Sequence, residues 1–295
     1  MPERRVALRA ALVLALAAGA GCGSADASDA QSWRTVSSSR QAWDEKALQV
    51  EVEYGAGRLR VSPADRPLLY QFQMRFDDSQ VTPVTEYDRA SGRLRLGMES
   101  RDRRRGIQVK NVSDEARADL HLTRDVPLDL ELEFGAGESD IDLGGLSLQR
   151  LRLATGASDT RVSFRSPNRI RAETVKMEAG AASFEATGLG NARAARYEFD
   201  GGVGEATLDF TGAWDRNASA KVSLGIGALK LRFPRDLGVR IVKDSFLTSF
   251  DAPGMVKRGG AYYSRNWESA SNRLTVELDA AFGSISVVWI DPQEN

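Results

Sequence analysis

A glycine-centred motif that recurs at nearly constant spacing is the strongest constraint on how this chain can fold. The copies are Gly55-Ala56-Gly57, Gly135-Ala136-Gly137, Gly156-Ala157-Ser158, Gly180-Ala181-Ala182, Gly202-Val203-Gly204, Gly225-Ile226-Gly227 and a degenerate Ala281-Phe282-Gly283. From position 135 to 225 successive copies start 21, 24, 22 and 23 residues apart. A period of this length is typical of proteins built from structural repeats that stack on one another.

Hydrophobic and polar residues alternate around each copy. The hydrophobic positions are Val50, Leu130, Leu151, Val175, Tyr197, Ala220 and Val276, then Val52, Leu132, Leu153, Met177, Phe199, Val222 and Leu278, and after the motif Val61, Ile141, Val162, Ala186, Leu208, Leu231 and Val287. Between the first two sets stand Glu51, Glu131, Arg152, Lys176, Glu198, Lys221 and Glu277. Because successive side chains of a strand point to opposite faces, the pattern predicts strands with a hydrophobic inner face and a charged outer face.

These observations predict an all-β fold, a β-solenoid or stacked-repeat parallel sheet with a glycine bend in each coil of about 22 residues. Glycine adopts positive φ without a Cβ penalty, so we expect it to join two strands within a coil. One unit of this size cannot bury its hydrophobic face alone, and neighbouring units must stack on it. The charge order along the outer face predicts ion pairs between neighbouring coils, each worth about 0.2–1 kcal/mol.

Two segments interrupt the period. Residues 68–76 and 93–96 read as strands, with a turn at Ser91-Gly92 between them. The segment 239–273 reads as a cap over the last coil, because an open end of a stack exposes strand edges. The domain boundaries that follow are a signal peptide at 1–21, a lipidated cysteine and flexible tether at 22–44, an amino-terminal β subdomain at 45–142, and solenoid repeats with a carboxy-terminal cap at 143–291.

The first residues have the layout of a secretion signal. Arg4, Arg5 and Arg9 precede an apolar run at 10–18, which is too short to be a permanent membrane span. The run leads to Gly19-Ala20-Gly21-Cys22, which resembles the lipobox of bacterial lipoproteins, although Gly19 stands where leucine is usual. The resemblance implies that Cys22 is acylated and anchors the chain to a membrane. The alternative is an ordinary signal peptide, which would leave Cys22 as a free thiol in an oxidising compartment.

Composition narrows the function. Forty basic and 41 acidic residues give a net charge of −1, which argues against nucleic acid as a partner. One Cys and one His exclude a disulfide within the chain and the usual zinc sites, and we expect no metal or cofactor. His121 lies in an alternating stretch, and we interpret it as a strand residue and not as a catalytic base.

The order of these elements resembles the toast-rack domain family of bacterial cell-envelope proteins, also called LiaF-like. The segments that carry the resemblance are 51–63, 130–137, 197–204, 225–227 and 233–239, within a region of 45–290. The resemblance implies the same stacked architecture, a location in the cell envelope and no assigned catalytic residue. Some members of that family take part in the response to cell-wall stress, which the resemblance extends to this chain as an expectation.

Three groups of residues are candidate sites. Glu138, Asp140 and Asp142 share a face and carry the chemistry of a calcium site or an acid–base pair, but acids do not continue on the next coil, which favours a solvated face. The basic run Arg101, Arg103, Arg104 and Arg105 suits anionic headgroups or envelope polymers, and the plainer interpretation is an exposed loop. The aromatic residues Tyr262, Tyr263 and Trp267 suit a sugar or a partner protein, and the plainer interpretation is packing within the cap.

The sequence therefore predicts an exported, lipid-anchored protein on the periplasmic or outer side of a bacterial membrane. We expect a non-catalytic binding or scaffolding module whose partners are the membrane, through its anchor, and an envelope protein or polysaccharide. The alternative is a surface adhesin or a glycan-binding or glycan-processing β-helix protein.

Overall fold

The computed structural model describes residues 31–101, 115–245 and 247–291. Sixteen strands form one sheet, and a short 3-10 helix, η2 (Leu189–Ala192), lies in a connecting loop. The strands are β1 (Trp33–Gln41), β2 (Leu48–Pro63), β3 (Leu68–Asp77), β4 (Val81–Asp88), β5 (Arg93–Ser100), β6 (Arg117–Leu122), β7 (Leu128–Asp142), β8 (Leu148–Ser163), β9 (Thr174–Thr187), β10 (Arg196–Asp209), β11 (Ala218–Pro234), β12 (Gly238–Ser245), β13 (Thr248–Asp251), β14 (Met255–Arg258), β15 (Ala261–Ser264) and β16 (Arg273–Ile290).

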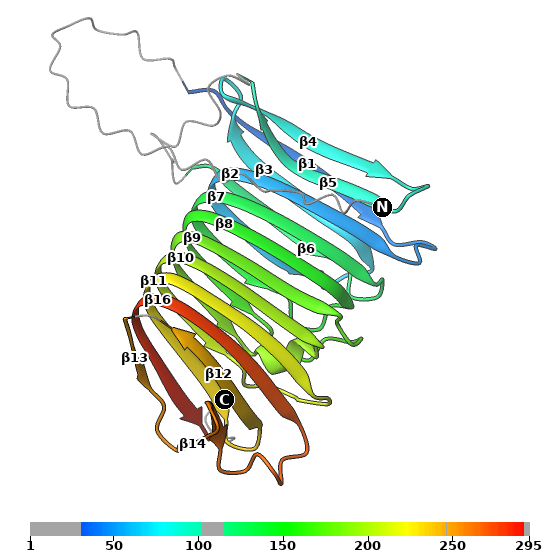
Figure 1. The fold of residues 1–295 in the computed structure, drawn as a ribbon. Coiled ribbons are helices and arrows are strands. Elements are labelled where there is room, and N and C mark those ends of the chain that lie inside the picture. Colours follow the sequence, from blue (N-terminus) through cyan, green and yellow to red (C-terminus); the bar gives the residue numbers. More distant parts are fainter. Residues whose placement is uncertain (1–30, 102–114, 246, 292–295) are drawn as a thin grey trace, which may run out of the picture. The chain divides into compact units, whose positions relative to one another are not determined.

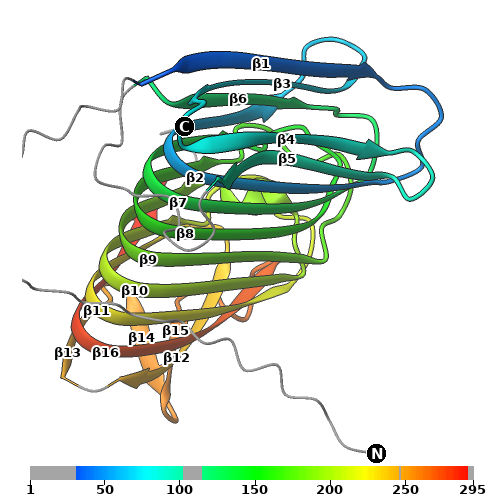
Figure 2. The same ribbon diagram turned by 90° about the horizontal axis from the view of Figure 1, so that it is seen from above.

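Each copy of the glycine motif lies inside one long strand. Strands β2, β7, β8, β9, β10, β11 and β16 are 14 to 18 residues long and pair in parallel in that order. Figures 1 and 2 show them as curved ribbons stacked side by side. From β7 to β11 a loop connects the end of each strand to the start of the next, whereas β3 to β6 come between β2 and β7, and β12 to β15 between β11 and β16. We expected two strands joined by a bend in each coil; instead one strand continues through the motif, because its backbone stays hydrogen-bonded to its neighbours on both sides of the glycines.

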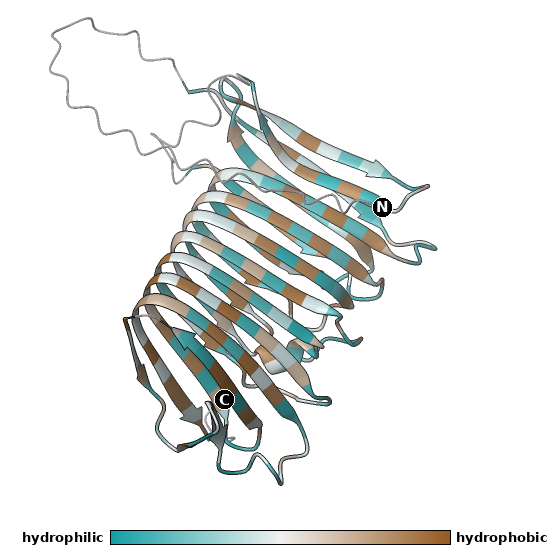
Figure 3. Cartoon of the chain, viewed as in Figure 1, coloured by the Kyte–Doolittle hydropathy of each residue, from teal (hydrophilic) through white to brown (hydrophobic). Residues whose placement is uncertain are grey.

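The predicted register of the inner face is confirmed. Leu132 pairs with Leu153, Leu153 with Met177, Met177 with Phe199, Phe199 with Val222 and Val222 with Leu278. None of these side chains is more than 2% exposed, and all belong to one hydrophobic core. Figure 3 shows hydrophobic and hydrophilic residues alternating along the strands. Burial of this continuous row is the main source of stability for the stack.

The alternation shifts by one residue at the motif. On β11 the inward side chain of Leu224 is followed by the inward side chain of Leu229, an odd separation that places one extra residue at the motif. Gly227 has φ +145°, and a Cβ there would lie 1.8 Å from the carbonyl oxygen of Gly204 on the preceding strand. Both the backbone angle and the close approach therefore require glycine at this position.

The amino-terminal strands extend the sheet beyond β2. β5 pairs in parallel with the first half of β2 and β6 with its second half, while β3 and then β1 continue the sheet in antiparallel fashion. β1 lies within residues 22–44, which we expected to be a tether, so ordered structure begins earlier than the composition indicated. The Nδ1 atom of His121, on β6, lies 2.8 Å from the hydroxyl oxygen of Ser62. This hydrogen bond fits the interpretation of His121 as a strand residue.

The carboxy-terminal segment differs from the expected cap. β16 lies between β11 and β12, although residues 235–272 separate β11 from β16 in the sequence. Each long strand of the parallel stack forms one rung. β12 and β13 pair in parallel with the two halves of β16 and together form one more rung, which is interrupted where Leu247 has φ +48°. β15 and β14 follow in antiparallel pairing. Part of the segment thus continues the stack, and the rest covers its end.

Polar side chains tie the connecting loops to one another. Asn168 is 1% exposed; its Oδ1 accepts the N–H of Leu148, and its amide donates to the carbonyl oxygens of Leu148 and Ile170. Burial alone would raise the pKa of Asp215, but hydrogen bonds from Arg193 (2.6 Å) and Arg171 (3.2 Å) outweigh it and lower the pKa. These contacts hold the loop side of successive rungs together.

Candidate functional site

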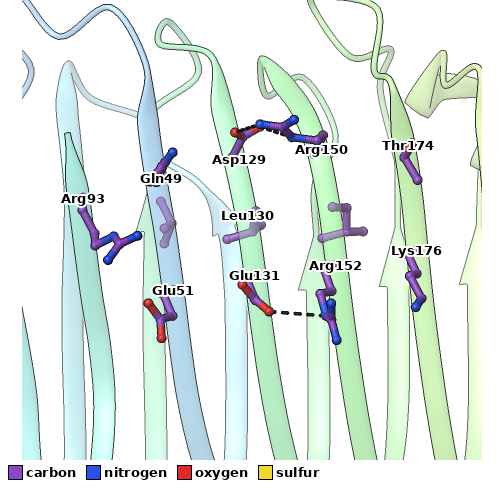
Figure 4. A pocket seen from close by; sticks show the side chains of 12 residues that line it. Gln49, Glu51, Arg93, Asp129, Leu130, Glu131, Arg150, Arg152, Thr174 and Lys176 are labelled. Atoms are coloured by element: carbon purple, nitrogen blue, oxygen red, sulfur yellow. Dashed lines mark hydrogen bonds and ion pairs between the residues drawn. The ribbon is translucent and has the colours of Figure 1, made fainter. Parts of the chain in front are cut away.

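The outer face of the first strand halves carries a shallow groove. It has a volume of about 480 Å³ and spans β5, β2, β7, β8 and β9 (Figure 4). Its polar lining residues are Gln49, Glu51, Arg93, Asp129, Glu131, Arg150, Arg152, Thr174 and Lys176. Parallel pairing brings them into rows across the stack, with one side chain from each rung, about 4.8 Å apart.

Opposite charges in this groove pair with each other. Glu131 lies 3.3 Å from Arg152 on the next rung, and Asp129 forms a bidentate pair with Arg150 (Figure 4). Both pairs are exposed, so each adds at most about 1 kcal/mol to stability. The pairs confirm the expected charge matching between rungs. They leave a surface of closely spaced donors and acceptors, which suits an extended polar partner better than a single ion.

Two acidic side chains lie beside the groove, two residues further along their strands than Glu51 and Glu131. Burial raises the pKa of Glu53, and the neighbouring carboxylates of Glu133 and Glu51 raise it further. Glu53 and Glu133 face each other on adjacent strands. The two facing carboxyl groups therefore make this part of the outer face acidic.

The predicted basic run is only partly described. The guanidinium of Arg101 lies 2.8 Å from the carboxylate of Asp78, in the turn after β3, and this ion pair fixes it at the sheet edge. Arg103, Arg104 and Arg105 lie outside the described residues, as does Cys22. Arg101 is thus committed to a structural contact, which favours the interpretation of an exposed loop for this residue.

The structure separates the predicted aromatic group. Tyr262 packs against the core, with its ring 4.8 Å from that of Phe250. Tyr263, the next residue in β15, pairs instead with Trp267 at 5.6 Å, and its hydroxyl accepts a hydrogen bond from Arg240. Because the two tyrosines point to opposite faces of β15, the three rings do not form one platform. The cap interpretation fits Tyr262 directly.

The predicted carboxylates share the outer face of β7, as expected, but each lies opposite a basic side chain. Glu138 pairs with Arg58 at 3.2 Å, and Asp142 lies 3.7 Å from Arg165 and accepts the N–H of Gly144. Asp140 stands opposite Arg161 on the next strand. Within the described part of the chain, no group of three or more His, Cys, Asp or Glu side chains is placed to hold a metal ion. In the same residues no helix is long and apolar enough to cross a membrane.

A groove at the carboxy-terminal end was not predicted from the sequence. It has a volume of about 650 Å³ and lies where β13 stops at Asp251, the register partner of Ser286. Trp289 lines it, and its ring lies 5.9 Å from that of Phe233, which in turn stacks on Phe210. The indole Nε1 donates to the carbonyl of Pro253. A signal was present in the sequence: all three rings stand eight residues after the start of a motif copy.

Polar groups surround this indole. The side chains of Arg235, Arg265, Asn266 and Asp251 line the same groove, and Arg235 is paired with Asp291 at 2.6 Å. An aromatic side chain fixed by a hydrogen bond, next to planar polar groups, is suited to a polar ring ligand.

Comparison with known proteins decides the family. A family model described as "N-terminal domain of toast_rack, DUF2154" matches residues 24–187, more than half of the chain. The chain belongs to the toast-rack family. The matched part of this toast-rack protein contains β1 to β9. A search of curated proteins finds no match.

Solved structures similar to this toast-rack chain come from several bacteria. One is named "putative cell adhesion protein" from Clostridium sporogenes, with a TM-score of 0.47 and 15% identity, covering 88% of this chain and 100% of that one. Another is a "putative adhesin" from Bacteroides fragilis, with a TM-score of 0.41 and 14% identity, covering 86% and 97%. A third is a "Putative lipid binding protein" from Parabacteroides distasonis, with a TM-score of 0.33 and 12% identity, covering 88% and 96%.

Proposed function

We propose that this toast-rack protein is a membrane-tethered, non-catalytic binding module of the bacterial cell envelope, built as a β-solenoid and anchored through acylated Cys22. The observation that carries the proposal is the uninterrupted row of buried side chains from Val52 on β2 to Leu278 on β16. Such a core makes the stack a rigid body, and a rigid body holds outward side chains at fixed spacing. Fixed spacing favours recognition, since little side-chain and loop freedom is lost on binding.

The anchor is tested by replacing Cys22. We expect the wild-type chain, expressed in a bacterium with lipoprotein processing, to be recovered with the membrane fraction and to be labelled by radioactive palmitate. The Cys22→Ala variant should lose the label and move to the soluble fraction, because the acyl chains supply the membrane affinity. Membrane recovery that is equal for the two chains would show that Cys22 is not the anchor.

A saccharide-binding adhesin is a second candidate, favoured by the groove at Trp289. We expect weak binding of short oligosaccharides such as chitotetraose or trigalacturonate, measured by nuclear magnetic resonance on the full chain. Trp289→Ala should abolish it, because the indole is the one aromatic ring among the residues that line the groove. Trp267→Ala, outside the groove, is the matched control and should leave binding unchanged. Equal loss in both variants would argue against this site.

A further inference from the structure

Four hydrophobic side chains form an exposed ridge along the bends of the last rungs. Val203, Ile226 and Phe282 are 53%, 52% and 46% exposed, and Leu247 is 69% exposed. Val203 is the register partner of Ile226, and Ile226 of Phe282. Leu247 lies at the bend of the next rung, between the pairs Ser245–Ala280 and Thr248–Gly283. We call these four residues the bend ridge.

The ridge is specific to the carboxy-terminal half of the stack. The same motif position holds Ala56, Ala136, Ala157 and Ala181 in the earlier strands. Glycines flank the centre of the motif on β10 and β11, so Val203 and Ile226 project between residues that have no side chain. Exposed hydrophobic side chains collected in one row indicate an interaction site more strongly than scattered ones do.

Acidic side chains border the ridge. Three exposed aspartates lie a few residues before the ridge on their strands: Asp200, Asp279 and Asp244. Asp244 and Asp279 are register partners on adjacent strands. Glu205 is exposed on the other side. A partner that covers the ridge must therefore bring positive charge next to its hydrophobic surface.

The spacing of the ridge fits a helix. Rungs are about 4.8 Å apart, so the four side chains extend over about 14 Å. An α-helix rises about 5.4 Å per turn, so one hydrophobic side chain from each turn meets one ridge residue over about three turns.

A second copy of the chain fits the ridge less well. Contact between two ridges would bring the two acidic rows together, and four side chains fall far short of the ~800 Å² per partner of a standard interface.

From this geometry we infer that the bend ridge docks an amphipathic helical segment of a partner protein, with hydrophobic residues on one face and basic residues beside them. The inference rests on the proposed binding role and does not depend on the membrane anchor. Binding to the purified chain thus tests it separately from the Cys22 experiment. Ridge side chains insert between the hydrophobic residues of the helix, and its Lys or Arg side chains reach the aspartates.

The test uses two synthetic 14-residue helices with the same leucine pattern, one with Lys and one with Glu at the polar positions, and fluorescence anisotropy with the full chain. We expect the Lys peptide to bind at least ~10-fold more tightly than the Glu peptide at low salt. The double variant Val203→Thr, Ile226→Thr should weaken Lys-peptide binding at least ~10-fold, through lost hydrophobic contact. Val256→Thr is the matched control, since Val256 is 43% exposed on β14, away from the ridge, and it should have no effect.

Several outcomes would overturn the inference. They are no binding of the Lys peptide, equal binding of both peptides, or equal loss in the ridge and control variants. Concentration-dependent dimers that disappear in the double variant would assign the ridge to a second copy. Ridge-dependent binding to phosphatidylcholine vesicles, without peptide binding, would assign it to a lipid surface. Circular dichroism should show that the double variant is folded, since both replaced residues are exposed and threonine retains strand propensity.

Discussion

Replacing Gly227 with alanine is expected to cost about 3 kcal/mol or more of the free energy of unfolding. The new Cβ would lie 1.8 Å from the carbonyl oxygen of Gly204, a backbone atom that cannot move without disturbing the pairing of β10 and β11. The residue also has φ +145°, which strains any side chain. Urea unfolding followed by circular dichroism measures the loss.

Gly259→Ala is the matched control. Gly259 also has positive φ (+52°), but no atom lies within 4 Å of the position its Cβ would take. We expect a loss of about 1 kcal/mol from the backbone angle alone. An equal loss of stability in the two variants would contradict the close approach of β11 to β10 at Gly227.

The second large effect is expected at the aromatic stack. Phe233 is 0% exposed, and its ring stacks on that of Phe210 at 5.4 Å and contacts that of Trp289. Phe233→Ala removes these contacts and leaves a cavity between two rungs, which should cost about 3–5 kcal/mol. The same unfolding experiment, with the midpoint and slope compared, measures it.

Phe282→Ala is the matched control, because it removes the same type of side chain from an exposed position. The side chain of Phe282 is 46% exposed on the bend ridge, so its removal should cost clearly less than the removal of the fully buried Phe233. A loss at Phe282 as large as that at Phe233 would mean that the ridge is part of the core, and would also argue against its role as a docking surface.

The inner face and the strand register could be predicted from the sequence because burial imposes them directly. Val222 and Leu278 had to face inward wherever their strands lie, since alternation with Lys221 and Glu277 leaves no other face. The ion pair between Glu131 and Arg152 follows from the same register. The inward or outward position of each side chain depends on local alternation, and the register depends on the position of each residue relative to the glycine motif.

The order of the last strands could not be predicted in this way. The degenerate motif copy at 281–283 indicated that β16 follows β11 in the stack. Nothing in the pattern showed that β12, which precedes β16 in the sequence, pairs with its other edge. The rung formed by β12 and β13 was missed because its bend contains Leu247 in place of a glycine motif. The partner of Arg101 was equally hidden, because Asp78 lies 23 residues away and meets it through the turn after β3.

Cross-linking of paired cysteines across β11 and β16, in a Cys22→Ser background, tests most directly whether the glycine-marked segments are neighbouring rungs in one register. Lys221 and Glu277 are register partners on the outer face, although 56 residues separate them. With a short thiol-reactive cross-linker, the pair Lys221→Cys, Glu277→Cys should react within one chain much faster than the pair Lys221→Cys, Val288→Cys, whose second residue lies opposite Arg232. No cross-link in the first pair, or equal rates in both, would contradict the stacked arrangement.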